Sequence, residues 1–207
     1  FVGGMASHIA DEMEAIGAKQ VLAPVLDIAR ELRWGRVEET FGEDPHLISC
    51  MGAAYMKAMH AKGMITTPKH FVAHGTPTAG LNLASVKGGK RELMSLYVKP
   101  FRELIAATKP LSAMNCYSSY DDEAVTGSKS LMTGLLRDSL GFRGYVYSDW
   151  GSVRMLSHFH RVAAPGGAAA RMAIEAGIDL EAGSEEYRHA EQMVREGFLD
   201  EKYIDRA

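Results

Sequence analysis

Short apolar runs and helical patterns alternate along this 207-residue chain, and the alternation limits its fold more than any other feature. The runs have strand length and no strict polar alternation, which is typical of parallel strands buried on both faces. The predicted strands are Val21 to Ile28, Met64 to Thr67, Leu111 to Tyr117, Tyr145 to Tyr147 and Gly177 to Glu181. The predicted helices are Met5 to Ile16, Pro45 to Lys62, Arg91 to Thr108 with a kink or break at Pro100, Ser130 to Leu140, Pro165 to Ala176 and Glu185 to Glu196. This order predicts an α/β fold.

A closed barrel and a doubly wound sheet both satisfy this order, and the polar residues favour the barrel. Polar side chains follow the predicted strand ends, which would meet at one mouth of a (β/α)8 TIM-type barrel. They are Arg36, Lys69, His70, Tyr117 with the turn formers Asp121 and Asp122, Asp149, Trp150 and Glu181. No Gly-x-Gly-x-x-Gly follows a strand, which disfavours a dinucleotide-binding sheet. Because five strands cannot close the barrel, we expect residues 1–207 to form part of one incomplete barrel domain whose remaining strands lie upstream.

Composition excludes several classes of function. Hydrophobic residues make up 46% of the chain and charged residues 24%, and the net charge is −3, so neither nucleic acid nor an acidic membrane is an expected partner. No apolar run is long enough to predict a membrane span. Cys50 and Cys116 lack metal-ligand spacing and are expected to be buried free thiols. His158 and His160 have no third ligand at a suitable spacing, so we expect no metal site and no cofactor.

The stretch from Gly144 to Gly151 places a carboxylate, Asp149, directly after a short strand and before a helix. A catalytic carboxylate occupies this position in barrel enzymes, although an Asp here can also simply cap the helix. Arg36, Lys69 and His70 would keep Asp149 ionised, and Trp150 offers a flat apolar surface to a sugar ring. The combination suggests glycoside chemistry, in which a carboxylate attacks an oxocarbenium-like centre.

Several motifs in order resemble those of glycoside hydrolase family 3. They are Ala23 to Ile28 through Arg36, Glu39 to Pro45, Lys69-His70-Phe71, Met114 to Tyr117 and Gly144 to Trp150. The resemblance covers essentially the whole chain. It implies a retaining exo-acting β-glycosidase, of β-glucosidase or β-xylosidase type, that releases terminal units from β-linked glycosides, with Asp149 as the nucleophile. By the same resemblance, Arg36, Lys69 and His70 bind sugar hydroxyls, Met114 and Tyr117 line the pocket, and Trp150 is the aromatic residue beside the nucleophile.

The resemblance also implies parts that these residues do not supply. In the family, the acid/base is usually a Glu on a following α/β-sandwich domain, and an upstream Asp binds the distal sugar hydroxyls. The loop from Thr78 to Asn82 lacks the Asp-x-His of the N-acetylglucosaminidase branch. Glu181 is a weaker candidate for a second carboxyl group, with substrate contact or an ion pair as its alternative role. We therefore expect residues 1–207 alone to turn over little substrate.

Two other classes of function stay open at this point. Lys69 could form a Schiff base, with His70 as its base, in an aldolase. The chain could also be a catalytically inert sugar-binding fragment. The sequence does not separate glucose from xylose and leaves linkage preference and homo-oligomer formation open, while the resemblance is compatible with a periplasmic or secreted protein.

Overall fold

Five parallel segments form the centre of the molecule, in the order in which they occur along the chain. The computed structural model describes all 207 residues. The regular strands are β1 (Gln20–Val21), β2 (Ile65–Thr66), β3 (Ser112–Met114) and β6 (Tyr145–Tyr147). β1 pairs with β2 and β3 with β6, both in parallel, and the bridges Val25–Lys69, Phe71–Asn115 and Tyr147–Leu180 join the pairs and add the fifth segment. Sequential parallel order with intervening helices is the arrangement of an incomplete (β/α) barrel, as predicted.

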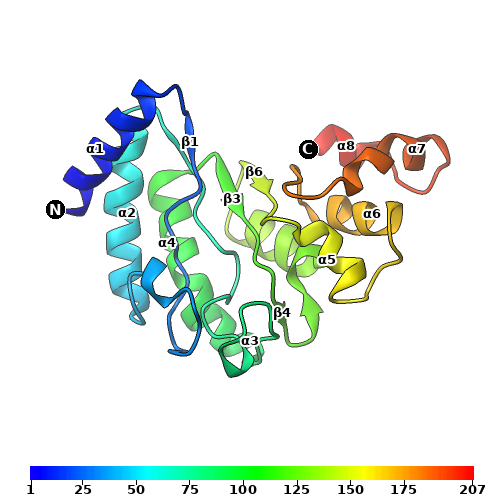
Figure 1. Cartoon of the computed structure of the whole chain (residues 1–207), viewed down its shortest axis with the longest axis horizontal. Coiled ribbons are helices and arrows are strands. Elements are labelled where there is room, and N and C mark those ends of the chain that lie inside the picture. Colours follow the sequence, from blue (N-terminus) through cyan, green and yellow to red (C-terminus); the bar gives the residue numbers. More distant parts are fainter.

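Helices flank these strands on both sides (Figure 1). α1 (Val2–Ala15), α2 (Pro45–Ala61) and α4 (Val98–Thr108) lie on one side of the view, with α2 packed against both of the others. The remaining helical segments are α3 (Gly89–Glu92), π-helical turns at Leu93–Tyr97 and Ser130–Ser139, α5 (Ser152–His158), α6 (Gly167–Ala176), α7 (Ala190–Arg195), α8 (Lys202–Arg206), and 3-10 turns at Val37–Glu39, Thr78–Gly80, Val125–Gly127 and Glu186–His189. None of the helices is long and apolar enough to cross a membrane.

Local sequence explains where α2 begins and why the segment before α4 contains a π-helical turn. Asp44 caps α2 by accepting the backbone N–H groups of His46 and Leu47 at 2.7 and 2.9 Å, and Pro45 occupies the first helical position. The predicted helix from Arg91 to Thr108 is three segments, because a π-helical turn precedes Pro100. A proline has no N–H to donate to the preceding turn, and its ring crowds the carbonyl group there. The wider π-helical turn relieves this crowding, which the sequence predicted as a kink or break at Pro100.

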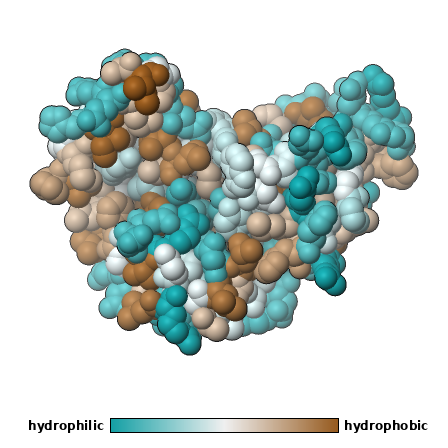
Figure 2. All heavy atoms as spheres, in the orientation of Figure 1, coloured by the Kyte–Doolittle hydropathy of each residue, from teal (hydrophilic) through white to brown (hydrophobic).

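The core joins the outer faces of the strands to the helices. Phe71 and Phe101 meet edge to face with their ring centres 5.1 Å apart, and both are almost completely buried. Met56 and Met59 lie on the buried side of α2 and are completely buried. On the surface, Figure 2 shows apolar atoms mixed with hydrophilic ones on the side of α1 and α2.

Three expectations require correction. Cys50 is exposed on α2, whereas Cys116 is buried as predicted; an outward-facing position on an amphipathic helix explains the difference. The predicted strand Gly177 to Glu181 is reduced to the single bridge at Leu180. The loop after Tyr117 contains an unpredicted hairpin, β4 (Ser119–Tyr120) and β5 (Glu123–Ala124), whose turn residues Asp121 and Asp122 have positive φ.

Candidate active site

Asp149 lies where β6 ends, with one carboxylate oxygen free. The Asp149 N–H donates to Asn115 Oδ1 at 3.1 Å, and its Oδ1 accepts the N–H of Trp150 at 2.7 Å. Oδ2 is buried and has no hydrogen-bond donor. The Ser152 N–H bonds to the backbone carbonyl of Asp149, at 2.9 Å, and no side chain caps α5. The carboxylate is therefore not a helix cap, and an unpartnered oxygen is what a nucleophile requires.

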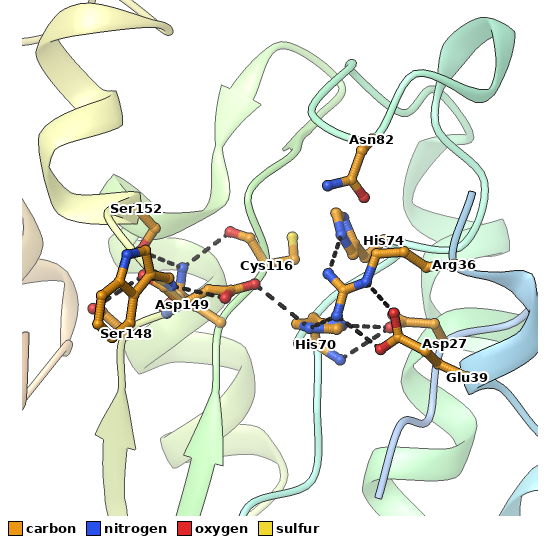
Figure 3. A network of polar contacts seen from close by, with 12 residues as sticks. Asp27, Arg36, Glu39, His70, His74, Asn82, Cys116, Ser148, Asp149 and Ser152 are labelled. Carbon is orange, nitrogen blue, oxygen red and sulfur yellow. Dashed lines mark hydrogen bonds and ion pairs between the residues drawn. The ribbon is translucent and has the colours of Figure 1, made fainter. Parts of the chain in front are cut away.

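His70 faces this free oxygen from the segment that follows β2, which β3 separates from β6 (Figure 3). Its Nε2 lies 3.5 Å from Asp149 Oδ2, and its Nδ1 lies 2.6 Å from Asp27 Oδ2. Both His70 and Asp27 are buried. Burial lowers the pKa of His70 to about 3, although the charge of Asp149 acts in the opposite direction. The imidazole is therefore neutral at physiological pH.

Arg36 is held between a carboxylate and two imidazoles. Its Nε and Nη2 donate to the two oxygens of Glu39 at 2.6 and 2.9 Å, a bidentate arrangement that fixes the guanidinium plane. Nη2 also lies 3.1 Å from His70 Nε2, and Nη1 lies 3.5 Å from His74 Nε2. Glu39 therefore holds the Arg36 side chain in place.

Lys69 adds a second cation beside Arg36 and Asp149. Burial, together with the charge of Arg36, lowers the pKa of Lys69, while the charge of Asp149 opposes that shift. Two cations and a free carboxylate oxygen thus share one partly buried space. Such an arrangement can bind several hydroxyl groups.

His74 forms the wall of the site with three other side chains. Its ring is buried between Trp34, His70 and Tyr117, with ring centres 5.1, 4.8 and 5.7 Å away. His74 Nδ1 lies 3.2 Å from Ser118 Oγ. Burial lowers the pKa of His74 to about 3, so this wall carries no charge of its own at neutral pH.

The other predicted residues take distinct places around Asp149. Burial and the negative charge of Asp149 raise the pKa of Tyr117, which sits beside the carboxylate. Met114 is buried at the end of β3, opposite Tyr147 on β6. The Trp150 side chain is 70% exposed, and its ring lies over Gly183, where an added Cβ would come within 2.5 Å of the ring.

Glu181 does not join the group around Asp149. Its carboxylate accepts the Ser184 hydroxyl and the N–H groups of Glu186 and Tyr187, the latter two at 3.0 and 2.8 Å. These contacts close the loop that carries Gly183 against Trp150. Glu181 therefore holds a loop through hydrogen bonds, and it forms no ion pair.

The sequence did not single out Asp27, Glu39, His74 or Asn115 individually as site residues. Asp27 was detectable, because a single carboxylate inside the apolar run Val21 to Ile28 needs a buried partner. Asn115 lies within the family motif Met114 to Tyr117, but its contact with Asp149 depends on the neighbouring strand, which the motif does not show. No group of three His, Cys, Asp or Glu side chains is arranged to hold a metal ion.

Comparison with known proteins agrees with the geometry. The model of the glycosyl hydrolase family 3 N-terminal domain matches residues 1–207. The chain is 33% identical to a β-xylosidase of Formosa agariphila, over 86% of the chain and 26% of that protein, and 31% identical to a periplasmic β-glucosidase of Salmonella typhimurium, over 92% and 26%. It thus spans about a quarter of these relatives.

Solved structures give the same result. A β-glucosidase from Erythrobacter marinus matches 99% of the chain, with 28% of that protein covered, at 33% identity and a TM-score of 0.96. A β-glucosidase from Listeria innocua matches 99% of the chain, with 29% covered, at 34% identity and a TM-score of 0.93. The family match over the whole chain, the barrel strands and the carboxylate at the end of β6 lead to one conclusion: the chain belongs to glycosyl hydrolase family 3.

Proposed function

We propose that this chain provides the nucleophile and part of the sugar-binding site of a retaining, exo-acting β-glycosidase of β-glucosidase type. The observation that carries the proposal is the buried Asp149 Oδ2, which has no donor and lies beside Arg36, Lys69 and His70. In the first step, Oδ2 forms a bond to the anomeric carbon while the bond to the leaving oxygen breaks and that oxygen takes a proton from an acid. Water then hydrolyses the glycosyl-Asp149 ester.

The sugar-binding roles follow from the donors and acceptors around Asp149. Arg36 and Lys69 offer N–H donors to sugar hydroxyls, and the neutral His70 offers its Nε2 as an acceptor. Met114 and Tyr117 line the same pocket, and the exposed ring of Trp150 covers its rim. Structures of the Listeria innocua β-glucosidase in complex with glucose and with isofagomine support a glucose-sized subsite in a protein 34% identical to this chain.

We also propose that the acid/base residue lies outside residues 1–207. The remaining strands of the barrel lie outside them as well. A retaining mechanism needs a second carboxyl group about 5–5.5 Å from the nucleophile, free to hold a proton. Glu39 is paired with Arg36, Asp27 lies behind His70, and Glu181 is bound to its own loop. A Glu on a second domain, as the family resemblance implies, would complete the pair. Accordingly, residues 1–207 alone should turn over little or no substrate.

Replacing the nucleophile tests the proposal. In the full-length protein, Asp149→Asn should lower kcat on an aryl β-glucoside by several orders of magnitude, because the amide cannot form the glycosyl ester. Proton NMR of the first sugar released by the wild type should show the β anomer. Near-normal turnover by Asp149→Asn, or release of the α anomer, would refute the assignment.

Two alternative functions, a β-xylosidase and an aldolase, are tested on the same full-length protein. The β-xylosidase reading is favoured by the named relatives of that activity and predicts a higher kcat/KM on the aryl β-xyloside than on the glucoside. The aldolase reading is favoured only by the lowered pKa of Lys69, which makes the amine a better nucleophile. Borohydride trapping of a carbonyl substrate on Lys69 would support it, and no trapping would remove it.

A further inference from the structure

The two nitrogens of His70 have different partners, and those partners determine where its single proton lies. Nε2 lies 3.1 Å from Arg36 Nη2, and a guanidinium has only donors, so Nε2 must be the acceptor. Nδ1 lies 2.6 Å from the Asp27 carboxylate, which has only acceptors when ionised, so Nδ1 carries the proton. Both contacts specify the same tautomer.

The contacts of Asp27 favour that tautomer. One oxygen, Oδ2, receives both the Nδ1–H and the backbone N–H of His70, at 2.6 and 3.3 Å. The other oxygen, Oδ1, is buried without a partner. The hydrogen bonds of the Asp27 carboxylate are therefore all made through Oδ2, and both go to His70.

The tautomer matters because Nε2 also faces the nucleophile. Asp149 Oδ2 is 3.5 Å from Nε2 and has no donor. A proton on Nε2 would point toward this oxygen and compete with the anomeric carbon for its lone pairs. It would also place two donors, Nε2–H and Arg36, against each other.

We propose that Asp27 is a positioning residue that keeps Nε2 of His70 unprotonated, which leaves Asp149 Oδ2 free to attack and presents Nε2 to a sugar hydroxyl as an acceptor. This inference rests on the proposed glycosidase function. Asp27 acts through His70 and does not touch the sugar.

Two substitutions separate this role from simple packing. In Asp27→Asn, the backbone N–H of His70 selects the amide orientation with oxygen at the Oδ2 position, so the Nδ1–H bond and the tautomer persist. In Asp27→Ala both bonds to Asp27 are lost, so Arg36 alone still favours the Nδ1-protonated ring and the proton can move to Nε2 when Arg36 turns to a sugar hydroxyl. Asp179→Asn serves as the control, because Asp179 is another buried carboxylate next to the sheet that contacts Arg137 and Val146 but not His70.

The experiment combines two readouts on the full-length protein. Nitrogen-15 NMR of histidine-labelled protein, with the His70 signals identified by their loss in His70→Gln, reports which ring nitrogen carries the proton. The rate of covalent labelling by a 2-deoxy-2-fluoro-β-glucoside with a good leaving group reports the reactivity of Asp149. A purely structural role for Asp27 would leave the tautomer unchanged in every folded variant.

We expect an Nδ1-protonated His70 ring in the wild type, in Asp27→Asn and in the control Asp179→Asn. Labelling should fall less than about tenfold in Asp27→Asn, and roughly tenfold to a hundredfold in Asp27→Ala, by analogy with the effect of removing the hydrogen-bond partner of a metal-binding imidazole. An Nε2-protonated ring in the wild type, or wild-type labelling by a folded Asp27→Ala, would overturn the inference. If the wild type shows the expected tautomer but is labelled by neither the fluoroglucoside nor the fluoroxyloside, the proposed function has failed, and the positioning role fails with it.

Discussion

Acid should destabilise this chain through its two buried imidazoles. Burial holds the pKa values of His70 and His74 at about 3, whereas in the unfolded chain both lie near 6.5. Between pH 3 and pH 6.5 the unfolded chain binds protons at these imidazoles and the folded chain does not. The free energy of unfolding therefore falls as the pH drops below about 6.5. Asp27 acts in the opposite direction, because burial raises its pKa to about 6 and the folded state takes up its proton first.

These shifts set the size of the effect. When the pH falls from 7 to 5, each imidazole lowers the free energy of unfolding by about 2 kcal/mol, and Asp27 raises it by about 1 kcal/mol. The net loss is roughly 2–3 kcal/mol, a large part of the about 5–15 kcal/mol that stabilises a typical domain. Nearly complete burial of all three groups means that solvent screening reduces these values little.

Urea unfolding at pH 7 and pH 5, followed by the fluorescence of the buried Trp34, measures the effect directly. His74→Gln should remove about 2 kcal/mol of the pH dependence, because one proton-binding site of the unfolded chain is lost. His8→Gln, at an exposed position on α1, is the matched control and should leave the pH dependence as in the wild type. Stability that is equal at the two pH values, or higher at pH 5, would refute the reasoning.

Three further outcomes follow from packing and loop contacts. Phe101→Ala should lower the free energy of unfolding by about 3–5 kcal/mol, measured by urea, because the ring is buried edge to face in the core; a loss below about 1 kcal/mol would contradict this packing. Gly183→Ala should displace the Trp150 ring and raise KM for a disaccharide more than for a small aryl glycoside, whereas Gly197→Ala, with a similar positive φ but open space around it, should alter neither; equal effects of the two variants would show backbone strain alone. Glu181→Gln should reduce kcat by less than about tenfold, since the amide oxygen can still accept one of the two loop N–H groups, and a loss of several orders would return Glu181 to a catalytic role.

The position of a residue relative to a strand end was predictable from the sequence. The run Tyr145 to Tyr147 followed by Asp149 indicated a carboxylate at a barrel mouth, and β6 has those bounds. Arg36 and His70 follow other strands, and parallel strands bring their carboxyl ends together whatever their spacing in the chain. This is why residues 34 positions apart could be expected at one site.

Contacts made across strands were not predictable in the same way. Asp27 looked like part of an apolar strand, and only the register of Val25 with Lys69 brings it to His70. Glu181 was a weaker candidate for the second carboxyl group, and its loop folds back so that its oxygens accept the N–H groups of Glu186 and Tyr187. Hydrogen-bond partners of this kind depend on the path of a loop, which local pattern does not determine.

The central claim is that Asp149 is the nucleophile of a retaining β-glycosidase. The most direct test is mass spectrometry of the full-length protein after treatment with a 2-deoxy-2-fluoro-β-glucoside that carries a good leaving group. The account predicts one fluorosugar on the peptide that contains Asp149, because its free Oδ2 forms the glycosyl ester and the fluorine slows its hydrolysis. A label on any other residue, Glu181 in particular, or no label from either the glucoside or the matching xyloside, would contradict it.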